Sequence, residues 1–386
     1  MLIMGTRGPR LPGSTLGCLA RIGMMILLIL FSGTASAQRY GFVAPGEYAV
    51  MIYHTDFSLY PFIRVYLRTF DDKMQPLADL NEHNTLLMVQ GRPYDPMKMQ
   101  FGIQSIRGRR EAIRSVFVID ASRSMGHGTG GIKSQVPRSK ANIPFEEMLR
   151  AVVRFIAGKR PQDEVAVLAV RDTKEGYAVV SRFERDGRVL ARRLTAIRAD
   201  GLKTRLYDTI DAALRMCGTS PEGSDPVVSC SVLVMSDGKD EGSAITRKDL
   251  MTRIADLPVP YPIYSLAYSP TSRGHFKNLE TLSKKSFGIY YKVGETPSGV
   301  QRIVEEIQNM LHSDYVVTLR SYLPVDGAKH NITLGVEAPS GSGNYAFDNS
   351  FFKAVRQSFT REAEEAKSLL AKKIEKLPDG AESSYY

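Results

Sequence analysis

Apolar runs alternate with amphipathic segments over residues 115–312. Runs such as SVFVID at 115–120, EVAVLAV at 164–170 and VSCSVLVMSD at 228–237 are apolar on both faces, which predicts buried strands. Helical patterns lie between such runs, and IPFEEMLRAVVRFIAGK at 143–159 is the clearest of them, with apolar residues three and four positions apart. This alternation predicts an α/β domain, built as a doubly wound, mainly parallel sheet with helices on both faces.

The segments on either side, 38–114 and 313–356, have the pattern of strands. They contain short runs rich in aromatic and branched residues, separated by Pro, Gly, Asp and Asn. The stretch RTFDDKMQPL at 68–77 predicts a hairpin turn, and HNITLGVE at 330–337 alternates cleanly between apolar and polar residues. We expect the two segments to form a flanking β-sandwich, which the chain leaves to build the α/β domain and then re-enters.

Residues 357–386 predict a charged helix and a loose tail. The helix carries a thin apolar stripe, made of Phe359, Ala363, Ala366, Leu370 and Ile374. A stripe of this kind favours docking on the protein itself over binding a partner helix.

The first 37 residues have the features of a secretory signal peptide. They contain three arginines and no acid, then the apolar run MMILLILF at 24–31, and they end in TASA at Ala37. This order predicts cleavage before Gln38, hence a periplasmic or extracellular protein with no stable membrane span after cleavage. An uncleaved anchor is the alternative, but the apolar run is short for a transmembrane helix.

The overall composition is that of an ordinary globular protein. The chain of 386 residues is 43% hydrophobic and 24% charged, with a formal net charge of +10. Lys and Arg are scattered rather than clustered, so we expect no nucleic-acid partner. The pattern favours no particular oligomeric state.

Cleavage before Gln38 would leave two cysteines, Cys217 and Cys230. An even pair this close in an exported chain favours a disulfide, and the turn-forming residues between them would let the chain bend back. Two buried free thiols are the alternative.

Polar oxygens follow two of the predicted strands directly. Asp120, Ser122 and Ser124 form the pattern D-x-S-x-S at the end of the strand 115–120, and Asp237 ends the strand 228–237. Thr204 comes just before another predicted helix. Ligands of parallel sheets bind at the carboxyl ends of strands, and hydroxyl and carboxylate oxygens suit hard cations such as Mg²⁺, Mn²⁺ or Ca²⁺.

These residues carry a resemblance to the von Willebrand factor type A domain, and in particular to exported bacterial members with flanking β segments. The resemblance covers about residues 112–312 and implies a Rossmann-like fold with a metal-ion-dependent adhesion site (MIDAS). All five positions of that site match here: Asp120, Ser122, Ser124, Thr204 and Asp237. By resemblance, Ser122 and Ser124 contact the metal, usually Mg²⁺, directly. Thr204 joins them in the open state, while the two aspartates act largely through water.

The resemblance implies an exported, metal-dependent adhesion module that binds a protein or peptide through an acidic side chain. We expect no enzyme and no catalytic residues, because no G-x-S-x-G or HExxH motif occurs and the site offers no free general base. One alternative is a structural scaffold of the cell envelope with a non-essential metal site. A metal-assisted hydrolase is the other.

Overall fold

The computed structural model describes residues 48–73, 75–126, 144–218, 227–257, 261–268, 274–294, 299–337 and 343–355. All of them belong to one compact unit, Val43–Tyr386. The predicted signal peptide, the loop after Ser124 and the predicted C-terminal helix lie outside these residues. In the described part of the chain, no helix has the length and apolar character needed to cross a membrane.

A six-stranded sheet forms the centre of the α/β part. Its order is β11-β10-β9-β6-β7-β8, and every neighbouring pair is parallel except β7 with β8. Its strands are β6 (Ala112–Asp120), β7 (Glu164–Val170), β8 (Tyr177–Glu184), β9 (Val227–Ser236), β10 (Ile263–Tyr268) and β11 (Tyr290–Gly294). The predicted α/β fold, mainly parallel and doubly wound, is confirmed.

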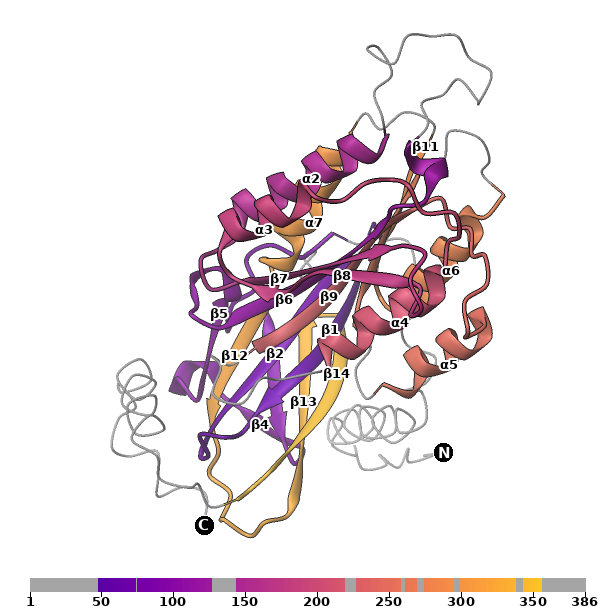
Figure 1. Ribbon diagram of the computed structural model, residues 1–386. Helices are drawn as coiled ribbons and strands as arrows, with labels where there is room; N and C mark the ends of the chain where they lie inside the picture. The colour runs from indigo at the N-terminus through magenta and orange to yellow at the C-terminus, as the bar shows by residue number, and fades with distance from the viewer. Residues whose placement is uncertain are drawn as a thin grey trace, which may run out of the picture. The chain divides into compact units, whose positions relative to one another are not determined.

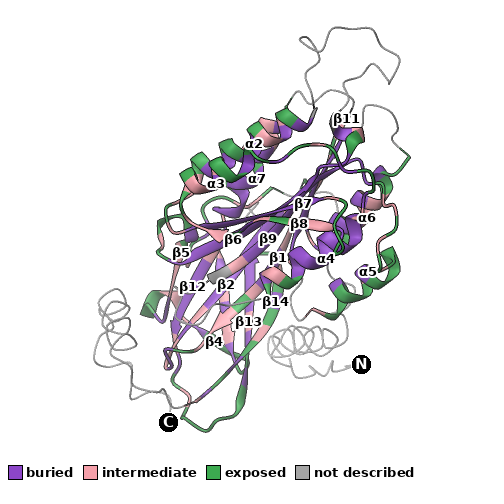
Figure 2. Ribbon diagram, in the orientation of Figure 1, coloured by how far each residue is buried: buried purple, intermediate pink, exposed green. Residues whose placement is uncertain are grey.

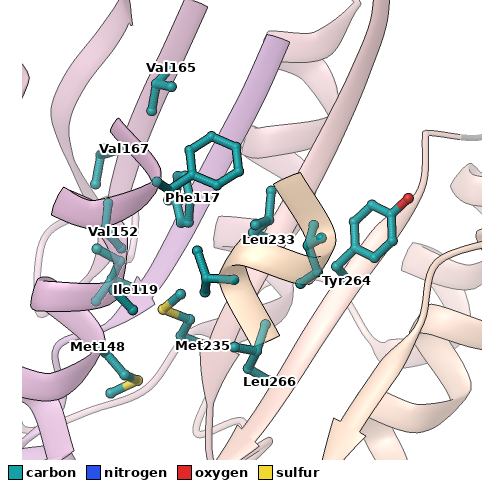
Figure 3. Packing of buried hydrophobic residues seen from close by; sticks show 14 of the residues in the cluster. Phe117, Ile119, Met148, Val152, Val165, Val167, Leu233, Met235, Tyr264 and Leu266 are labelled. Atoms are coloured by element: carbon teal, nitrogen blue, oxygen red, sulfur yellow. The ribbon is translucent and has the colours of Figure 1, made fainter. Parts of the chain in front are cut away.

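Helices cover both faces of this sheet (Figure 1). One apolar cluster packs the sheet against α2 (Pro144–Gly158), α3 (Gly187–Leu194) and α7 (Val300–Leu311). A second cluster packs the opposite face against α4 (Leu206–Cys217), α5 (Arg247–Asp256) and α6 (Phe276–Lys285). Successive strand residues alternate between the clusters. Phe117 and Ile119 face α2 (Figure 3), whereas Val116 and Val118 belong to the cluster on the α4 face.

The strands on either side of the α/β part build two antiparallel sheets. One has the order β1-β2-β12-β5 and the other β14-β13-β3-β4, and each combines strands from before and after the α/β part. The strands are β1 (Tyr48–Asp56), β2 (Phe62–Asp71), β3 (Thr85–Val89), β4 (Arg92–Tyr94), β5 (Phe101–Ser105), β12 (Tyr315–Arg320), β13 (Lys329–Glu337) and β14 (Tyr345–Lys353). One apolar cluster fills the space between the sheets, as expected for a β-sandwich.

The hairpin predicted for 68–77 is wrong. β2 pairs with β1 and β12, whereas β3 pairs with β13 and β4, so the turn connects two different sheets. Asp71 organises it, because its carboxylate accepts hydrogen bonds from the backbone of Lys73 and Gln75. Such residues predict that the chain turns, but they do not determine which strands pair afterwards.

Candidate metal site

The predicted site residues lie at the carboxyl ends of two neighbouring strands. β6 ends at Asp120 and β9 ends at Ser236, directly before Asp237. The two strands are parallel and Ile119 pairs with Met235, so both ends reach the same edge of the sheet. This is the edge at which parallel sheets bind their ligands.

Asp120 is completely buried and held from two sides. Its Oδ1 accepts a hydrogen bond of 2.9 Å from the Ser122 backbone N–H, and its Oδ2 accepts one of 2.7 Å from the Ser236 hydroxyl. The Ser236 oxygen in turn accepts a bond of 3.0 Å from the Gly238 N–H. The orientation of the carboxylate is therefore set by both strands.

Ser122 and Ser124 lie where the chain leaves the extended conformation. A short 3-10 turn, η4 (Arg123–Gly126), begins directly after Ser122 and brings the two hydroxyl oxygens within 2.9 Å of each other. Ser122 also forms a bridge with Gly201, and the Arg123 N–H donates to the Gly201 carbonyl at 2.8 Å. The serine turn is thus attached to the segment that leads into Thr204.

Thr204 and Asp237 come from the loops that enter α4 and leave β9. The Glu241 N–H donates to the Thr204 carbonyl oxygen at 2.5 Å, which joins the two loops. Gly238 follows Asp237 with a φ of 78°, and a Cβ there would lie 2.6 Å from the His275 carbonyl oxygen. Only glycine fits this turn without displacing the start of α6.

The site opens into a cavity of about 240 Å³. Its lining residues are Ser122, Arg123, Ser124, Gly201, Leu202, Thr204, Asp237, Lys239, Glu241 and His275. Four of the five predicted residues are among them, and the fifth, Asp120, lies buried and hydrogen-bonded to Ser122. The structure therefore brings all five together from three separate segments of the chain.

The carboxyl groups of Asp120 and Asp237 are both buried, which disfavours their ionised forms. Burial, and then the charge of Asp237, raise the pKa of Asp120 to about 6. Burial also raises the pKa of Asp237. A cation between the two carboxylates would reverse this effect, because an opposite charge favours the ionised form.

The available donors fit a hard divalent cation. The cavity offers hydroxyl and carboxylate oxygens together, as Mg²⁺, Mn²⁺ or Ca²⁺ prefer. Among the residues that the structure describes, no group of three or more His, Cys, Asp or Glu side chains is placed to hold a metal. A site here therefore depends on the serine and threonine hydroxyls as well as the carboxylates.

Nearby acidic residues have other partners. Asp208 accepts hydrogen bonds from the backbone of Ala244 and Ile245, at 2.9 and 3.2 Å. Asp240 accepts one of 3.1 Å from the Tyr207 N–H, and Glu241 pairs with Lys239. Asp208 and Asp240 thus fasten the loop after β9 to the start of α4.

Two residues of the site, Ser236 and His275, are not indicated by the local sequence. Ser236 precedes Asp237 in the motif, but its bond to Asp120 depends on the register between β6 and β9. His275 reaches the cavity from the start of α6, and the sequence around it carries no motif that would indicate this.

Cys217 and Cys230 form a disulfide with an S–S distance of 2.04 Å. It joins the end of α4 to β9. Thr204 lies just before α4 and Asp237 lies at the end of β9, so the disulfide connects the two elements that position these residues.

Comparison with known proteins gives a match of residues 115–239 to the model of the von Willebrand factor type A domain. Among curated proteins, none matches the chain.

Of the solved structures, 126 chains match. The mussel byssus proximal thread matrix protein 1, in a structure with a zinc occupied MIDAS motif, is 11% identical, with a TM-score of 0.38 over 52% of this chain and 48% of that one. The SpRpn10 VWA domain is 12% identical, with a TM-score of 0.36 over 50% and 95% of the two chains. The PilB minor pilin of Streptococcus sanguinis, in the form of a point mutant, is 12% identical, with a TM-score of 0.42 over 73% and 80%.

This chain therefore spans about half the length (48%) of the mussel protein. The order and direction of the central strands, together with the match of residues 115–239, show that the chain contains a von Willebrand factor type A domain.

Proposed function

We propose that this chain is an exported binding protein that uses a divalent cation to recognise a protein or peptide partner. Mg²⁺ is the cation we expect first, with Mn²⁺ and Ca²⁺ as substitutes. The partner supplies an acidic side chain. Domains of this type generally mediate protein–protein interactions, and the proposal adds a specific site and a ligand chemistry.

One observation carries the proposal. Side chains from three separate segments, represented by Ser124, Thr204 and Asp237, converge on one cavity above the buried Asp120. Burying two carboxylates with too little compensating charge is costly, as the raised pKa of Asp120 indicates. A cation bound between them would offset this cost, and this would explain why two carboxylates are buried at one place.

Each residue has a defined role in the proposed site. Ser122, Ser124 and Thr204 supply neutral hydroxyl oxygens to the cation, and Asp120 and Asp237 supply negative charge, largely through water. The bound cation provides an electrophilic position that a carboxylate can fill. Because the hydroxyls carry no charge, they leave that position attractive to an anion.

The rim of the cavity supports an acidic partner. Arg123, Lys239 and His275 line it, and Arg123 is exposed. Lys239 pairs with Glu241, so Arg123 is the cationic side chain best placed to meet a second acidic group on the partner.

Export is part of the proposal. The disulfide between Cys217 and Cys230 is compatible with an oxidising compartment, where such bonds persist. We expect the mature chain to begin at Gln38. N-terminal sequencing of the exported protein tests this directly, and a mature chain that retains residues before Gln38 would contradict it.

Calorimetry tests the metal site. The chain from Gln38 is titrated with Mg²⁺ and Mn²⁺, beside Asp120→Ala and Ser124→Ala, with Glu241→Gln as the matched control on the rim of the same cavity. We expect one saturable site that Asp120→Ala abolishes, that Ser124→Ala weakens at least tenfold, and that Glu241→Gln changes less than threefold. Equal binding by all four proteins would contradict the proposed ligands.

A binding assay tests the function. The same proteins are used to select peptides from a random library, with Mg²⁺ or with chelator. We expect acidic peptides that bind only with Mg²⁺ and not to Asp120→Ala. Function that survives Asp120→Ala would favour the scaffold alternative, and turnover that this variant abolishes would favour a hydrolase.

A further inference from the structure

The outer face of the sheet β14-β13-β3-β4 carries a row of aromatic side chains along β14, interrupted by the polar Asn349. Phe347 and Phe351 of β14 are 42% and 48% exposed, and the Tyr345 ring lies 5.9 Å from that of Phe347. Phe347 lies over Gly335 of β13, where a Cβ would be 2.5 Å from its ring. Figure 2 shows the exposed and half-buried positions along β14 and β13, in contrast to the buried central sheet.

The two ends of this face differ in charge. The register of β13 and β14 pairs Lys329 with Lys353 at one end and Glu337 with Tyr345 at the other. The Lys329 ammonium group lies 3.3 Å from the centre of the Phe351 ring, so this charge belongs to the aromatic row. The face is therefore basic where the chain leaves β14 and acidic at its far end.

The segment that follows β14 has matching features in its sequence. Its apolar stripe begins at Phe359 and runs through Leu370 and Ile374. A helix over 359–377 would be about 27 Å long, at 1.5 Å per residue. The nine residues of β14 span a similar length, about 27 Å at 3.4 Å per step. The helix and the exposed strand face therefore match in length.

The charges of the segment are also unevenly distributed. Its first half, 357–366, contains Glu362, Glu364 and Glu365 against Arg361, a net charge of −2. Its second half, 367–377, contains Lys367, Lys372, Lys373 and Lys376 against Glu375, a net charge of +3. At 100° per residue, Glu362 and Lys373 both border the apolar stripe on the same side, whereas Lys372 lies on the opposite face. Along the segment, the charge is therefore acidic first and basic second. Along the sheet face from Lys353 to Glu337, the charge is basic first and acidic second.

We propose that residues 357–377 form a helix that docks on this outer face, antiparallel to β14. The chain leaves β14 at Lys353, so it can cover the face only by running back along it. The apolar stripe would then cover Phe347 and Phe351. The acidic half would lie near Lys329 and Lys353, and Lys373 would lie near Glu337. The proposal does not depend on the metal site.

Cysteine cross-linking tests the docking. The chain from Gln38 contains only Cys217 and Cys230, which form a disulfide, so a new pair can be followed by thiol titration. In the docked helix Leu370 lies over Phe347. We expect Phe347→Cys with Leu370→Cys to form an intramolecular disulfide at least tenfold faster than Phe347→Cys with Lys372→Cys, at any protein concentration. Equal rates would overturn the proposal, and so would a disulfide-linked dimer, which would mean that a second copy covers the face.

A charge exchange tests the orientation without altering the apolar surface. We expect Glu337→Lys and Lys373→Glu each to increase chymotrypsin cleavage within 357–377 about two- to threefold. The double variant should return to the rate of the unaltered chain, and Lys372→Glu should leave the rate unchanged. A double variant that is cleaved as fast as the single ones would overturn the antiparallel arrangement.

Discussion

The Ser236 hydroxyl donates a hydrogen bond of 2.7 Å to Oδ2 of Asp120, across the neighbouring strands β9 and β6. Both groups are completely buried. This bond fixes the carboxylate beneath the cavity, while the other oxygen of Asp120 holds the serine turn through the Ser122 N–H. Ser236 does not line the cavity, so it supports the proposed metal site from behind Asp120.

Replacing Ser236 with alanine should weaken metal binding. Loss of the bond frees one oxygen of Asp120, and changes of this kind in the residues behind metal ligands typically cost tenfold or more in affinity. We therefore expect calorimetry of Ser236→Ala to give a dissociation constant for Mn²⁺ about tenfold higher than that of the unaltered chain.

Ser231 provides the matched control on the same strand. It is also buried, but its hydroxyl has no hydrogen-bond partner among the described residues. Ser231→Ala should leave Mn²⁺ affinity unchanged. An equal loss of affinity in Ser231→Ala and Ser236→Ala would show that β9 responds to any substitution and that the bond to Asp120 has no special role.

The raised pKa of Asp120 predicts how pH acts on the metal-free chain. The folded-state pKa of about 6 lies above the ordinary value of 3.8, so the folded protein retains this proton between those values. The contribution of Asp120 to the free energy of unfolding therefore falls as pH rises through the interval between the two pKa values. The whole decrease is about 3 kcal/mol, and the contribution stays low above about pH 6.

Urea unfolding in chelator from pH 4 to pH 7 measures this effect. The free energy of unfolding of the unaltered chain, minus that of Asp120→Asn, should decrease by about 2 kcal/mol over the range, because asparagine does not titrate. A difference that stays constant or increases with pH would contradict the assignment. With Mn²⁺ present, affinity should instead fall below about pH 6, since protons compete with the cation for Asp120.

A buried ion pair connects the sandwich to the end of the α/β part. Two guanidinium nitrogens of Arg68 on β2 donate to the two carboxylate oxygens of Asp314, at 2.7 and 2.8 Å, just before β12. Arg68→Met should lower the free energy of unfolding by about 3–5 kcal/mol, because it leaves the buried Asp314 without its cation.

An exposed pair gives the control for this prediction. Arg302 and Glu306 on α7 are 3.9 Å apart, with side chains 79% and 51% exposed. Arg302→Met should change the free energy of unfolding in urea by less than about 1 kcal/mol. If Arg68→Met is as mild as Arg302→Met, Asp314 must acquire another partner or water when Arg68 is removed.

The disulfide should contribute to the stability of the site's framework. Cys217 and Cys230 are 13 positions apart, and closing a loop of this size is worth about 3 kcal/mol in the chain-entropy model. The double variant Cys217→Ser with Cys230→Ser should therefore unfold at a lower urea concentration. Its free energy of unfolding should be lower by about 3 kcal/mol. Unchanged stability in the double variant would show that the reduced chain is already constrained by other contacts.

The sequence predicted the site better than it predicted the strand pairing around it. Asp120, Ser122 and Ser124 fall within five residues, so one strand end and one turn suffice to bring them together. The bond from Ser236 needs the register of two strands that are more than a hundred residues apart, which no local pattern encodes.

The sequence predicts that strands exist in the flanking segments, but it does not predict which of these short strands pair with each other. β5 (Phe101–Ser105) has the apolar alternation of Phe101 and Ile103, but it pairs with β12, far away in the sequence, and local periodicity does not indicate that partner. The antiparallel pairing of β7 and β8 is indicated by the length of the segment between them. The connection at 171–176 is too short for the crossover that parallel strands require.

Crystals of the chain from Gln38 grown with Mn²⁺ would show whether the five proposed residues hold a cation. Anomalous diffraction locates manganese independently of any assumption about its ligands. We expect one strong anomalous peak in the cavity, at about 2.1–2.3 Å from the hydroxyl oxygens of Ser122 and Ser124. We also expect the peak to be absent from crystals of Asp120→Ala. A cavity without a peak at saturating Mn²⁺, or a peak held by other residues, would contradict the proposed metal site.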